Sequence, residues 1–397
     1  MISERIQNLA PSATLAMSQK SAELKAQGID IINLSVGEPD FNTPDFIKEA
    51  AKKAIDDNFS TYSPVPGYLS LRKAISHKLK TENSLNFAPE QVVVGNGAKQ
   101  ELCNAILALI NPGDEVIIPT PAWVSYVEMV KLAEGKSVLV PAGVEDDFKI
   151  TAEQLKKAIT PKTRLLLLNS PCNPTGSVYT KDELKKMAEV LADYPDVLVM
   201  SDEIYEHINF VGGKIVSIAS FPEMKDRVII INGVSKAYAM TGWRVGYMAA
   251  PLQIAKAVTK LQGQYTSGCS SIAQKAAEAA YTGPQQCVED MRQAFERRRD
   301  LIVELAKNIP GWKVNKPDGA FYLFPEVSSY IGKKYGDTEI KSSGDYVMYL
   351  LQEAHVACVD GEAFCAPGYM RLSYATSEEN IRKAMERIRE ASLKLHD

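Results

Sequence analysis

Residues 228–236 read VIIINGVSK, and residues 197–205 read VLVMSDEIY. In both stretches a short apolar, β-branched run ends in polar side chains. Such a run between helical segments is typical of a buried strand in a parallel sheet. The polar residues that follow then lie at the sheet edge where open α/β folds bind ligands. These two stretches predict an α/β fold with a binding site at the carboxyl ends of its strands.

The same alternation of helical and strand patterns extends from residue 43 to about residue 250. Thr43-Pro44 is typical of a helix start with proline at the first helical position, and Thr151 and Thr180 each begin a capping-box sequence. Strands separated by helices predict βαβ units and a mostly parallel sheet. The expected strands cover residues 91–94, 115–118, 164–168, 197–200, 228–231 and 245–249.

The pattern changes after residue 285. A long charged helix is expected over about residues 285–308, and a closing helix from about residue 377. Short strands are expected between them, near residues 320–323, 355–359 and 370–373, which indicates a smaller α+β unit. Residues 28–36 read as a helix stop followed by a strand and are assigned to the same unit. We therefore expect a large domain over residues 43–285 and a small domain formed by residues 1–42 and 286–397.

Composition excludes several classes of protein. The chain has 397 residues, of which 45% are hydrophobic and 24% charged, an ordinary globular mixture. A net charge of −4 without a basic stripe argues against a nucleic-acid partner. The longest uncharged run, residues 165–180, contains two prolines and cannot span a bilayer, and the N-terminus lacks the apolar core of a signal peptide. We expect a cytoplasmic protein without a membrane partner, with no metal site because the six cysteines lack zinc spacing.

Two motifs suit a phosphate group. Gly95 and Gly97 follow a strand and open a helix, where backbone N–H groups and the helix dipole favour an anion. They form only part of a nicotinamide fingerprint, because Gln100 occupies the third glycine position. Arg244 follows Lys236 by eight residues, and a guanidinium is a natural bidentate partner of phosphate. A tight structural turn is the alternative reading of the glycines.

Other strand ends carry residues that suit covalent chemistry. Lys236 directly follows an apolar strand, and a desolvated lysine with a lowered pKa can form a Schiff base, although such a lysine can also simply reach water. Asp202 and Tyr205 end the preceding strand, where the carboxylate could face a protonated ring nitrogen or serve as a helix cap. Asn173 lies in a rigid loop between two prolines at another strand end. Each motif alone also fits a structural role, and the prediction of a site depends on their combination.

With this combination the chain resembles, across nearly its whole length, the class I, fold-type I pyridoxal-phosphate aminotransferases. It is most similar to bacterial aspartate aminotransferases that carry Pro-Ser-Ala-Thr near the N-terminus. The resemblance implies a mostly parallel seven-stranded sheet between helices in a large domain, plus a smaller α+β domain. The matching segments are Pro11 to Thr14, residues 37–41, Tyr62, Ala122-Trp123, the Asn173 loop, residues 201–205, residues 235–237 and residues 371–375.

The resemblance implies a cofactor, pyridoxal 5′-phosphate, in a Schiff base with Lys236. Lys236, Asp202 and Tyr205 are the implied catalytic residues, and Asp202 would keep the ring nitrogen protonated. Tyr62 would reach the phosphate of the neighbouring subunit, which predicts a homodimer with shared active sites. The remaining implied cofactor contacts are Gly97, Ala98, Lys99, Trp123, Asn173, Ser235 and Arg244.

The resemblance also implies the reaction, in which the amino group of L-aspartate passes to 2-oxoglutarate by a ping-pong mechanism and gives oxaloacetate and L-glutamate. Arg371 would bind the α-carboxylate of the substrate. The other implied substrate contacts are Gly37, Trp123, Asn173, Ser12, Thr14 and Lys99. In the family that the chain resembles, members that also use prephenate tend to carry lysine where this chain has Ala10, which argues against that substrate. The open alternatives are aromatic or alanine transamination and cysteine-conjugate β-elimination on the same fold.

Overall fold

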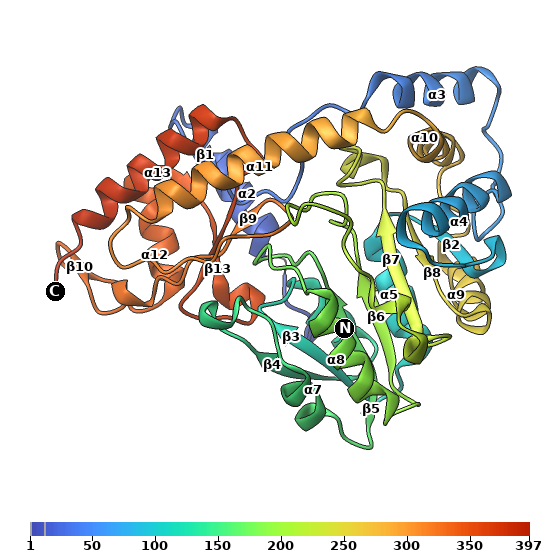
Figure 1. Cartoon of the computed structure of the whole chain (residues 1–397). Helices are drawn as coiled ribbons and strands as arrows, with labels where there is room; N and C mark the ends of the chain where they lie inside the picture. The colour runs from blue at the N-terminus through green and yellow to red at the C-terminus, as the bar shows by residue number, and fades with distance from the viewer. Residues whose placement is uncertain (1, 12) are drawn as a thin grey trace.

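A seven-stranded sheet forms the centre of the protein (Figure 1) in a computed structural model that describes residues 2–11 and 13–397. Its strand order is β2-β8-β7-β6-β5-β3-β4, and only β8 runs antiparallel to its neighbours, β2 and β7. The sheet predicted from the sequence is confirmed. The strands are β2 (Val92–Gly95), β3 (Glu115–Thr120), β4 (Lys136–Pro141), β5 (Thr163–Asn169), β6 (Leu198–Asp202), β7 (Val228–Gly233) and β8 (Gly246–Ala249).

Strand β4 was not among the strands expected from the sequence. It lies at one edge of the sheet and pairs only with β3. Its residues are mostly exposed or half-buried, and only Val140 is buried. Strand β4 therefore differs from the other edge strand, β2, which is buried at every position and was predicted from its apolar run.

Helices cover both faces of the sheet, which explains why its central strands carry apolar side chains on both faces, as residues 165–168 of β5 and residues 228–231 of β7 do. Along β7, Ile229 and Ile231 pack toward one face, and Val228 and Ile230 toward the other. The first face is covered by α5 (Ala98–Leu109), α6 (Ser125–Leu132) and α9 (Leu252–Tyr265). The second face is covered by α3 (Asp45–Asp56), α4 (Leu69–Asn83), α7 (Ala152–Ala158), α8 (Lys181–Ala192) and α10 (Ser271–Thr282).

A second hydrophobic core lies beside the sheet and is built from the two ends of the chain. There β1 (Ile32–Asn33) pairs in parallel with β12 (Val356–Ala357), so these residues of the N-terminal segment pair with the C-terminal part of the chain. Figure 1 shows the long helix α11 running from the sheet to this core. The domain limits at residues 43 and 285 stay a prediction. The other elements are α1 (Glu4–Gln7), α2 (Ala13–Ala26), α11 (Gln286–Ala306), α12 (Ser343–Tyr349), α13 (Glu378–Leu393), β9 (Tyr322–Leu323), β10 (Lys334–Tyr335), β11 (Thr338–Glu339), β13 (Val359–Asp360) and β14 (Met370–Ser373).

The local signals at helix starts are mostly confirmed. Thr151 and Thr180 both form complete capping boxes at α7 and α8. Pro44 occupies the N-cap of α3 and not the first helical position expected from the sequence. All six cysteines are free thiols. Across residues 2–11 and 13–397 the helices are too short or too polar to cross a membrane.

One buried carboxyl group stands out in the core. Glu101, in the first turn of α5, is completely buried, and neither of its oxygens accepts a hydrogen bond of normal geometry from the described residues. Gly95 leaves the space for it, because a Cβ atom there would lie 2.0 Å from Glu101 Oε1. Burial raises the pKa of Glu101 to about 8. This side chain is therefore neutral in the folded protein at pH 7.

We predict that Glu101→Gln stabilises the protein and that the gain depends on pH. Between the unfolded pKa near 4.5 and the folded pKa near 8, the unfolded state releases a proton that the folded state retains, so the stability of the wild type falls as pH rises. Glutamine removes this loss and should add about 1–3 kcal/mol at pH 7. Urea unfolding at pH 5, 7 and 8.5 measures the gain, with the exposed Glu49→Gln as a matched control. An equal gain at pH 5 and pH 8.5 would contradict the prediction.

Candidate active site

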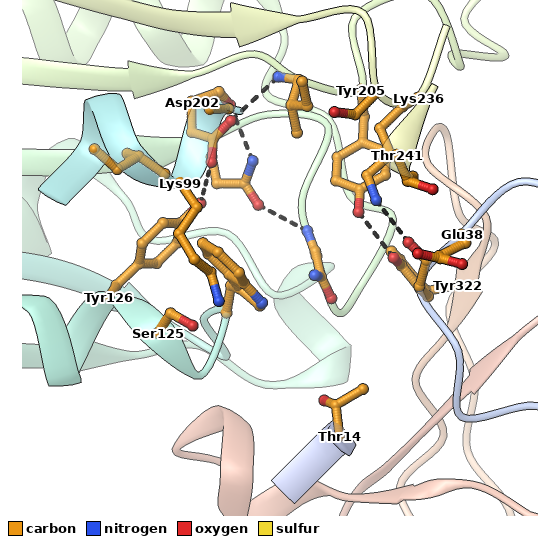
Figure 2. Close-up of a pocket in the computed structure, with 18 of the residues that line it drawn as sticks. Thr14, Glu38, Lys99, Ser125, Tyr126, Asp202, Tyr205, Lys236, Thr241 and Tyr322 are labelled. Carbon is orange, nitrogen blue, oxygen red and sulfur yellow. Dashed lines mark hydrogen bonds between the residues drawn. The ribbon is translucent and has the colours of Figure 1, made fainter. Parts of the chain in front are cut away.

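A cavity of about 620 Å³ opens at the carboxyl ends of the central strands (Figure 2). It brings together most of the residues predicted from the sequence. Its lining also includes residues that were given no site role from the sequence, namely Leu15, Glu38, Leu102, Ser125, Tyr126, Asn169, Ile204, Thr241, Gly242 and Tyr322. The predicted residues in its wall are Thr14, Gly37, Ala98, Lys99, Trp123, Asn173, Asp202, Tyr205, Ser235, Lys236, Arg244 and Arg371.

Lys236 follows β7 and turns its amine into this cavity. Its Nζ donates a hydrogen bond of 2.6 Å to the carbonyl oxygen of Gly37. Burial lowers the pKa of Lys236 to about 8, and the positive charges of Arg371 and Arg244 act in the same direction, while Glu38 and Asp202 oppose them. Near neutral pH a useful fraction of this amine is therefore unprotonated and nucleophilic.

Asp202 ends strand β6 and is almost completely buried. The Tyr126 hydroxyl donates a hydrogen bond of 2.7 Å to its Oδ2 atom, and the backbone N–H of Ile204 donates one of 3.2 Å to Oδ1. Burial raises the pKa of Asp202 to about 6, although both hydrogen bonds and the Lys236 charge favour the ionised form. The carboxylate is therefore anionic at pH 7 and has a strong preference for a protonated partner.

Sequence reasoning missed Tyr126. It lies in the first turn of α6, which follows β3 at the same edge of the sheet, three residues after the predicted Trp123. Its first-turn position after a strand does not distinguish it from a core residue, because its ring packs in the core and only its hydroxyl reaches Asp202.

Arg371, on β14, is a buried cation without an acidic partner among the residues that the structure describes. Its Nη1 atom donates a hydrogen bond of 2.9 Å to Asn173 Oδ1, and its Nη2 atom donates one of 2.7 Å to the Ser35 carbonyl. Its Nε atom is buried and has no partner in the described part of the chain. A buried guanidinium without its counter-charge is costly, so this position favours an anionic ligand.

Asn173 is held by a second asparagine that the sequence reading also missed. Asn169, at the end of β5, accepts a hydrogen bond of 2.8 Å from the backbone N–H of Asn173 through its Oδ1 atom. Its Nδ2 atom donates a hydrogen bond of 2.9 Å to the Asp202 carbonyl. The ends of β5 and β6 are thereby fixed to each other, which positions Asn173 for its contact with Arg371.

The predicted phosphate site lies at the start of α5, where Lys99 and Arg244 are cationic lining residues of the cavity. Gly97 adopts φ +82°, and a Cβ atom there would lie 2.4 Å from Arg244 Nη2, so glycine is required. Arg244 Nη2 donates a hydrogen bond of 3.1 Å to the Asn96 carbonyl. Ala98 and Ser235 complete the wall. The unpaired N–H groups of a helix start together with a guanidinium match a phosphate dianion.

Trp123 and Lys99 form another part of the wall. Lys99 Nζ lies 4.7 Å from the centre of the Trp123 ring, a cation–π contact. Desolvation and the neighbouring Arg244 charge lower the pKa of Lys99. Figure 2 shows Lys99 with Ser125 and Tyr126 on the side of the cavity opposite to Lys236 and Tyr322.

Two predicted residues that the structure describes, Gly97 and Tyr62, do not line the cavity. Gly97 lies just behind Arg244, as described above. Tyr62 lies in the loop before α4, and 96% of its surface is exposed. Ser12 lies outside the described residues. Its neighbour Thr14, on α2, does face the cavity (Figure 2).

The fold and the cavity together define a pyridoxal-phosphate-dependent enzyme of fold type I. The donor set fits this cofactor, because one cavity holds a nucleophilic lysine amine, a buried carboxylate for a protonated ring nitrogen and a cationic site for a phosphate. The chain belongs to the class I and II aminotransferases, whose family profile matches residues 29–388.

Individual relatives agree with this assignment. The chain is 48% identical over 390 residues to the aspartate/prephenate aminotransferase of Nitrosomonas europaea and 49% identical over 391 residues to the aspartate aminotransferase of Geobacillus stearothermophilus, with 98% of each chain covered in both cases. Its structure is similar to an aspartate aminotransferase from Rhizobium meliloti, with a TM-score of 0.96, 43% identity and full coverage of both chains. A Thermus thermophilus aspartate aminotransferase with maleate gives a TM-score of 0.92 at 41% identity, over 98% of this chain and 99% of that one.

We predict that Lys236 reacts with amine reagents at unusually low pH in the cofactor-free protein. Its labelling rate should reach half its maximum near pH 8, because only the unprotonated amine reacts and burial lowers its pKa to about 8. Reductive methylation across pH 6–11, followed by peptide mass spectrometry, measures this midpoint. Lys52 serves as an internal control, because Glu49 raises its pKa. A Lys236 midpoint above pH 10 would show that the amine is not desolvated.

Proposed function

We propose that this aminotransferase moves the amino group of L-aspartate to 2-oxoglutarate, giving oxaloacetate and L-glutamate. The observation that carries the proposal is a pair of cations, Arg371 and Lys99, in the wall of the cavity that also holds the Lys236 amine. A dicarboxylate substrate can use both cations, whereas a neutral amino acid needs only one. The relatives named aspartate aminotransferase support the same choice.

When bound, the cofactor supplies an aldehyde carbon that takes up the amino group and a ring that accepts electrons from the substrate Cα. Asp202 would hold its negative charge against the ring nitrogen and keep that nitrogen protonated. The Lys236 amine, with its pKa near 8, would move a proton between the substrate Cα and the cofactor carbon, first as a base and then as an acid. A group that acts as base and then as acid works best with a pKa near the working pH.

The remaining residues would orient the reactants. Arg371, which lines the cavity without an acidic partner among the described residues, would bind the α-carboxylate with its planar guanidinium. Tyr205 and Asn173 would face the oxygen of the ring, and Trp123 would stack on its face. The N–H groups of Ala98 and Lys99, with Ser235 and Arg244, would hold the phosphate. Gly37 would let the backbone approach the substrate.

A side-chain carboxylate would meet Lys99, with Thr14 nearby. Lys99 lies in the first turn of α5, so its backbone N–H can serve the phosphate while its side chain faces the cavity. Its ammonium has the Trp123 ring as a neighbour and no acidic partner among the described residues. The ammonium is therefore available to an acidic substrate. Ser12, predicted to join this contact, lies outside the described residues.

The exposed Tyr62 supports a homodimer with shared active sites. A tyrosine ring with 96% of its surface exposed, in a loop that also contains Pro64 and Pro66, is accessible to a neighbouring subunit. In the proposed dimer Tyr62 would complete the phosphate site of the neighbouring subunit. The cytoplasmic location expected from the sequence stays a prediction.

Prephenate is a second candidate acceptor, because the name of the Nitrosomonas europaea relative includes it. Ala10 argues against it, since members of the family that use prephenate tend to carry lysine at that position. Ala10 is also engaged locally, where its backbone N–H donates a hydrogen bond of 2.9 Å to Glu128 Oε2. Assays with both acceptors decide between the two.

We predict that the purified protein is yellow and that borohydride fixes the colour covalently on Lys236, as peptide mass spectrometry would show. It should convert L-aspartate and 2-oxoglutarate to oxaloacetate, and prephenate should be a poor acceptor.

Lys236→Ala should abolish turnover while the fold and much of the cofactor affinity remain, because the phosphate and ring contacts persist. If borohydride fixes the cofactor on Lys236 but the protein does not convert aspartate, the assignment to the enzyme class stands and the proposed substrate is wrong. Normal turnover by Lys236→Ala would refute the role of the lysine.

We predict that Lys99→Ala lowers kcat/KM for aspartate and glutamate about ten- to a hundredfold, the value of a charge-assisted contact of about 1.5–3 kcal/mol. Alanine and phenylalanine should be affected little, because their α-carboxylate still meets Arg371. Steady-state assays with acidic and neutral amino acids measure the split, and Lys52→Ala, on α3, is a matched control. Equal losses for both kinds of substrate would instead assign Lys99 to the phosphate site.

A further inference from the structure

Tyr322 occupies a central position in the cavity that none of the sequence motifs includes. It begins β9, which pairs antiparallel with β14, the strand that carries Arg371. The side chain is completely buried and lines the cavity. Its ring contacts two predicted site residues that belong to different parts of the fold, Tyr205 after β6 and Arg371 on β14.

The first contact joins two hydroxyl groups. The Tyr322 and Tyr205 oxygens lie 2.8 Å apart, and the two rings meet edge to face with centres 5.8 Å apart (Figure 2). Gly37 leaves space for this arrangement, because a Cβ atom there would lie 2.8 Å from the Tyr322 oxygen. The pair therefore shares one hydrogen bond, and either hydroxyl can be its donor.

The second contact is with the guanidinium. The Cζ atom of Arg371 lies 4.5 Å from the centre of the Tyr322 ring and 4.9 Å from the centre of the Phe364 ring. Such contacts favour a cation that burial has removed from water. Tyr322 thus supports Arg371 with its ring and Tyr205 with its hydroxyl.

The number of hydroxyl protons limits which tyrosine can donate the hydrogen bond between Tyr205 and Tyr322. Each phenol has one proton to donate. If Tyr205 gives its proton to the ring oxygen of the cofactor, the bond between the two tyrosines needs the proton of Tyr322. Among the described residues, Tyr205 is the hydrogen-bond partner of the Tyr322 hydroxyl. Tyr322 is therefore free to act as this donor.

We propose that Tyr322 is a positioning residue that donates its hydroxyl proton to Tyr205, so that Tyr205 directs its own proton at the cofactor, while the Tyr322 ring holds Arg371 in place for the substrate carboxylate. The proposal rests on the proposed function, since it assigns Tyr205 to the ring oxygen. A hydroxyl that accepts a hydrogen bond becomes a stronger donor, so the two bonds reinforce each other.

The expected effect is on the pKa of the Lys236 nitrogen when that nitrogen is bonded to the cofactor. A stronger hydrogen bond from Tyr205 withdraws negative charge from the ring oxygen, and the weaker charge on this oxygen lowers the pKa of the nitrogen. The charged and titratable groups that act on Lys236 and on the tyrosine pair are Asp202, Glu38, Arg244 and Arg371. Tyr322→Phe leaves all of them in place and removes only the hydroxyl.

The test compares Tyr322→Phe, Tyr322→Leu and wild type by the pH midpoint of the cofactor's absorbance change and by the dissociation constant for maleate. Tyr322→Phe should raise the midpoint by about 0.3–1 pH unit and change maleate binding less than about twofold, because the ring still covers Arg371. Tyr322→Leu should also weaken maleate binding at least about fivefold. Tyr346→Phe is the control, since this buried hydroxyl contacts Ser392 at 2.6 Å, in the second core.

A Tyr322→Phe midpoint within 0.1 unit of wild type, in a coloured protein, would overturn the proposal and leave the proposed function intact. A shift equal to that of Tyr346→Phe would overturn it as well, because it would reflect only a general cost of removing a buried hydroxyl. A wild-type protein that binds no cofactor at Lys236 would refute both. If Tyr322→Leu does not fold, Tyr322→Phe alone decides.

Discussion

The structure depends on the burial of opposite charges at one edge of a sheet that is itself covered on both faces. Asp202, Lys236 and Arg371 all face the same cavity, and removal of charges from water costs free energy unless each charge finds a partner. Asp202 is held by hydrogen bonds, whereas Arg371 has none with an acid in the described part of the chain. This imbalance makes the folded protein a receptor for a group with both an anionic and a cationic end.

Packing of the surrounding apolar residues offsets the free-energy cost of burying these charges. Apolar strands such as β7 are fixed on both faces by helices, so the polar residues at their ends cannot relax into solvent. The second core contributes from the other side, because β14 carries Arg371 and pairs with β9 and β13. The cavity exists only where the two cores meet. Its chemistry therefore depends on contacts between segments that are far apart in sequence.

The sequence predicted what depends on local pattern. Six of the seven strands of the large sheet, the capping boxes and the strand-end residues Asn173, Asp202 and Lys236 follow from apolar runs and the residues that end them. Strand β4 was missed because only one of its residues is buried, unlike the fully buried edge strand β2. Tyr322 and Tyr126 escaped because their role depends on a hydroxyl that meets a residue far along the chain, and nothing local marks a buried tyrosine as anything but core. Most of the expected cofactor contacts came from family resemblance, and their roles stay proposals.

The reversed strand β8 has a consequence for how the molecule is made. In the sheet, β2 has β8 as its single neighbour, and a Cβ atom at Gly246 would lie 2.1 Å from the backbone nitrogen of Ala98. The start of α5 therefore rests on a strand that leaves the ribosome about 150 residues later than β2. Until residue 249 has been synthesised, β2 has no place in the sheet and Arg244 cannot reach the Gly97 turn. A nascent chain thus gains the pocket between Arg244 and the start of α5 only late in translation, after β3, β5, β6 and β7 are available to assemble.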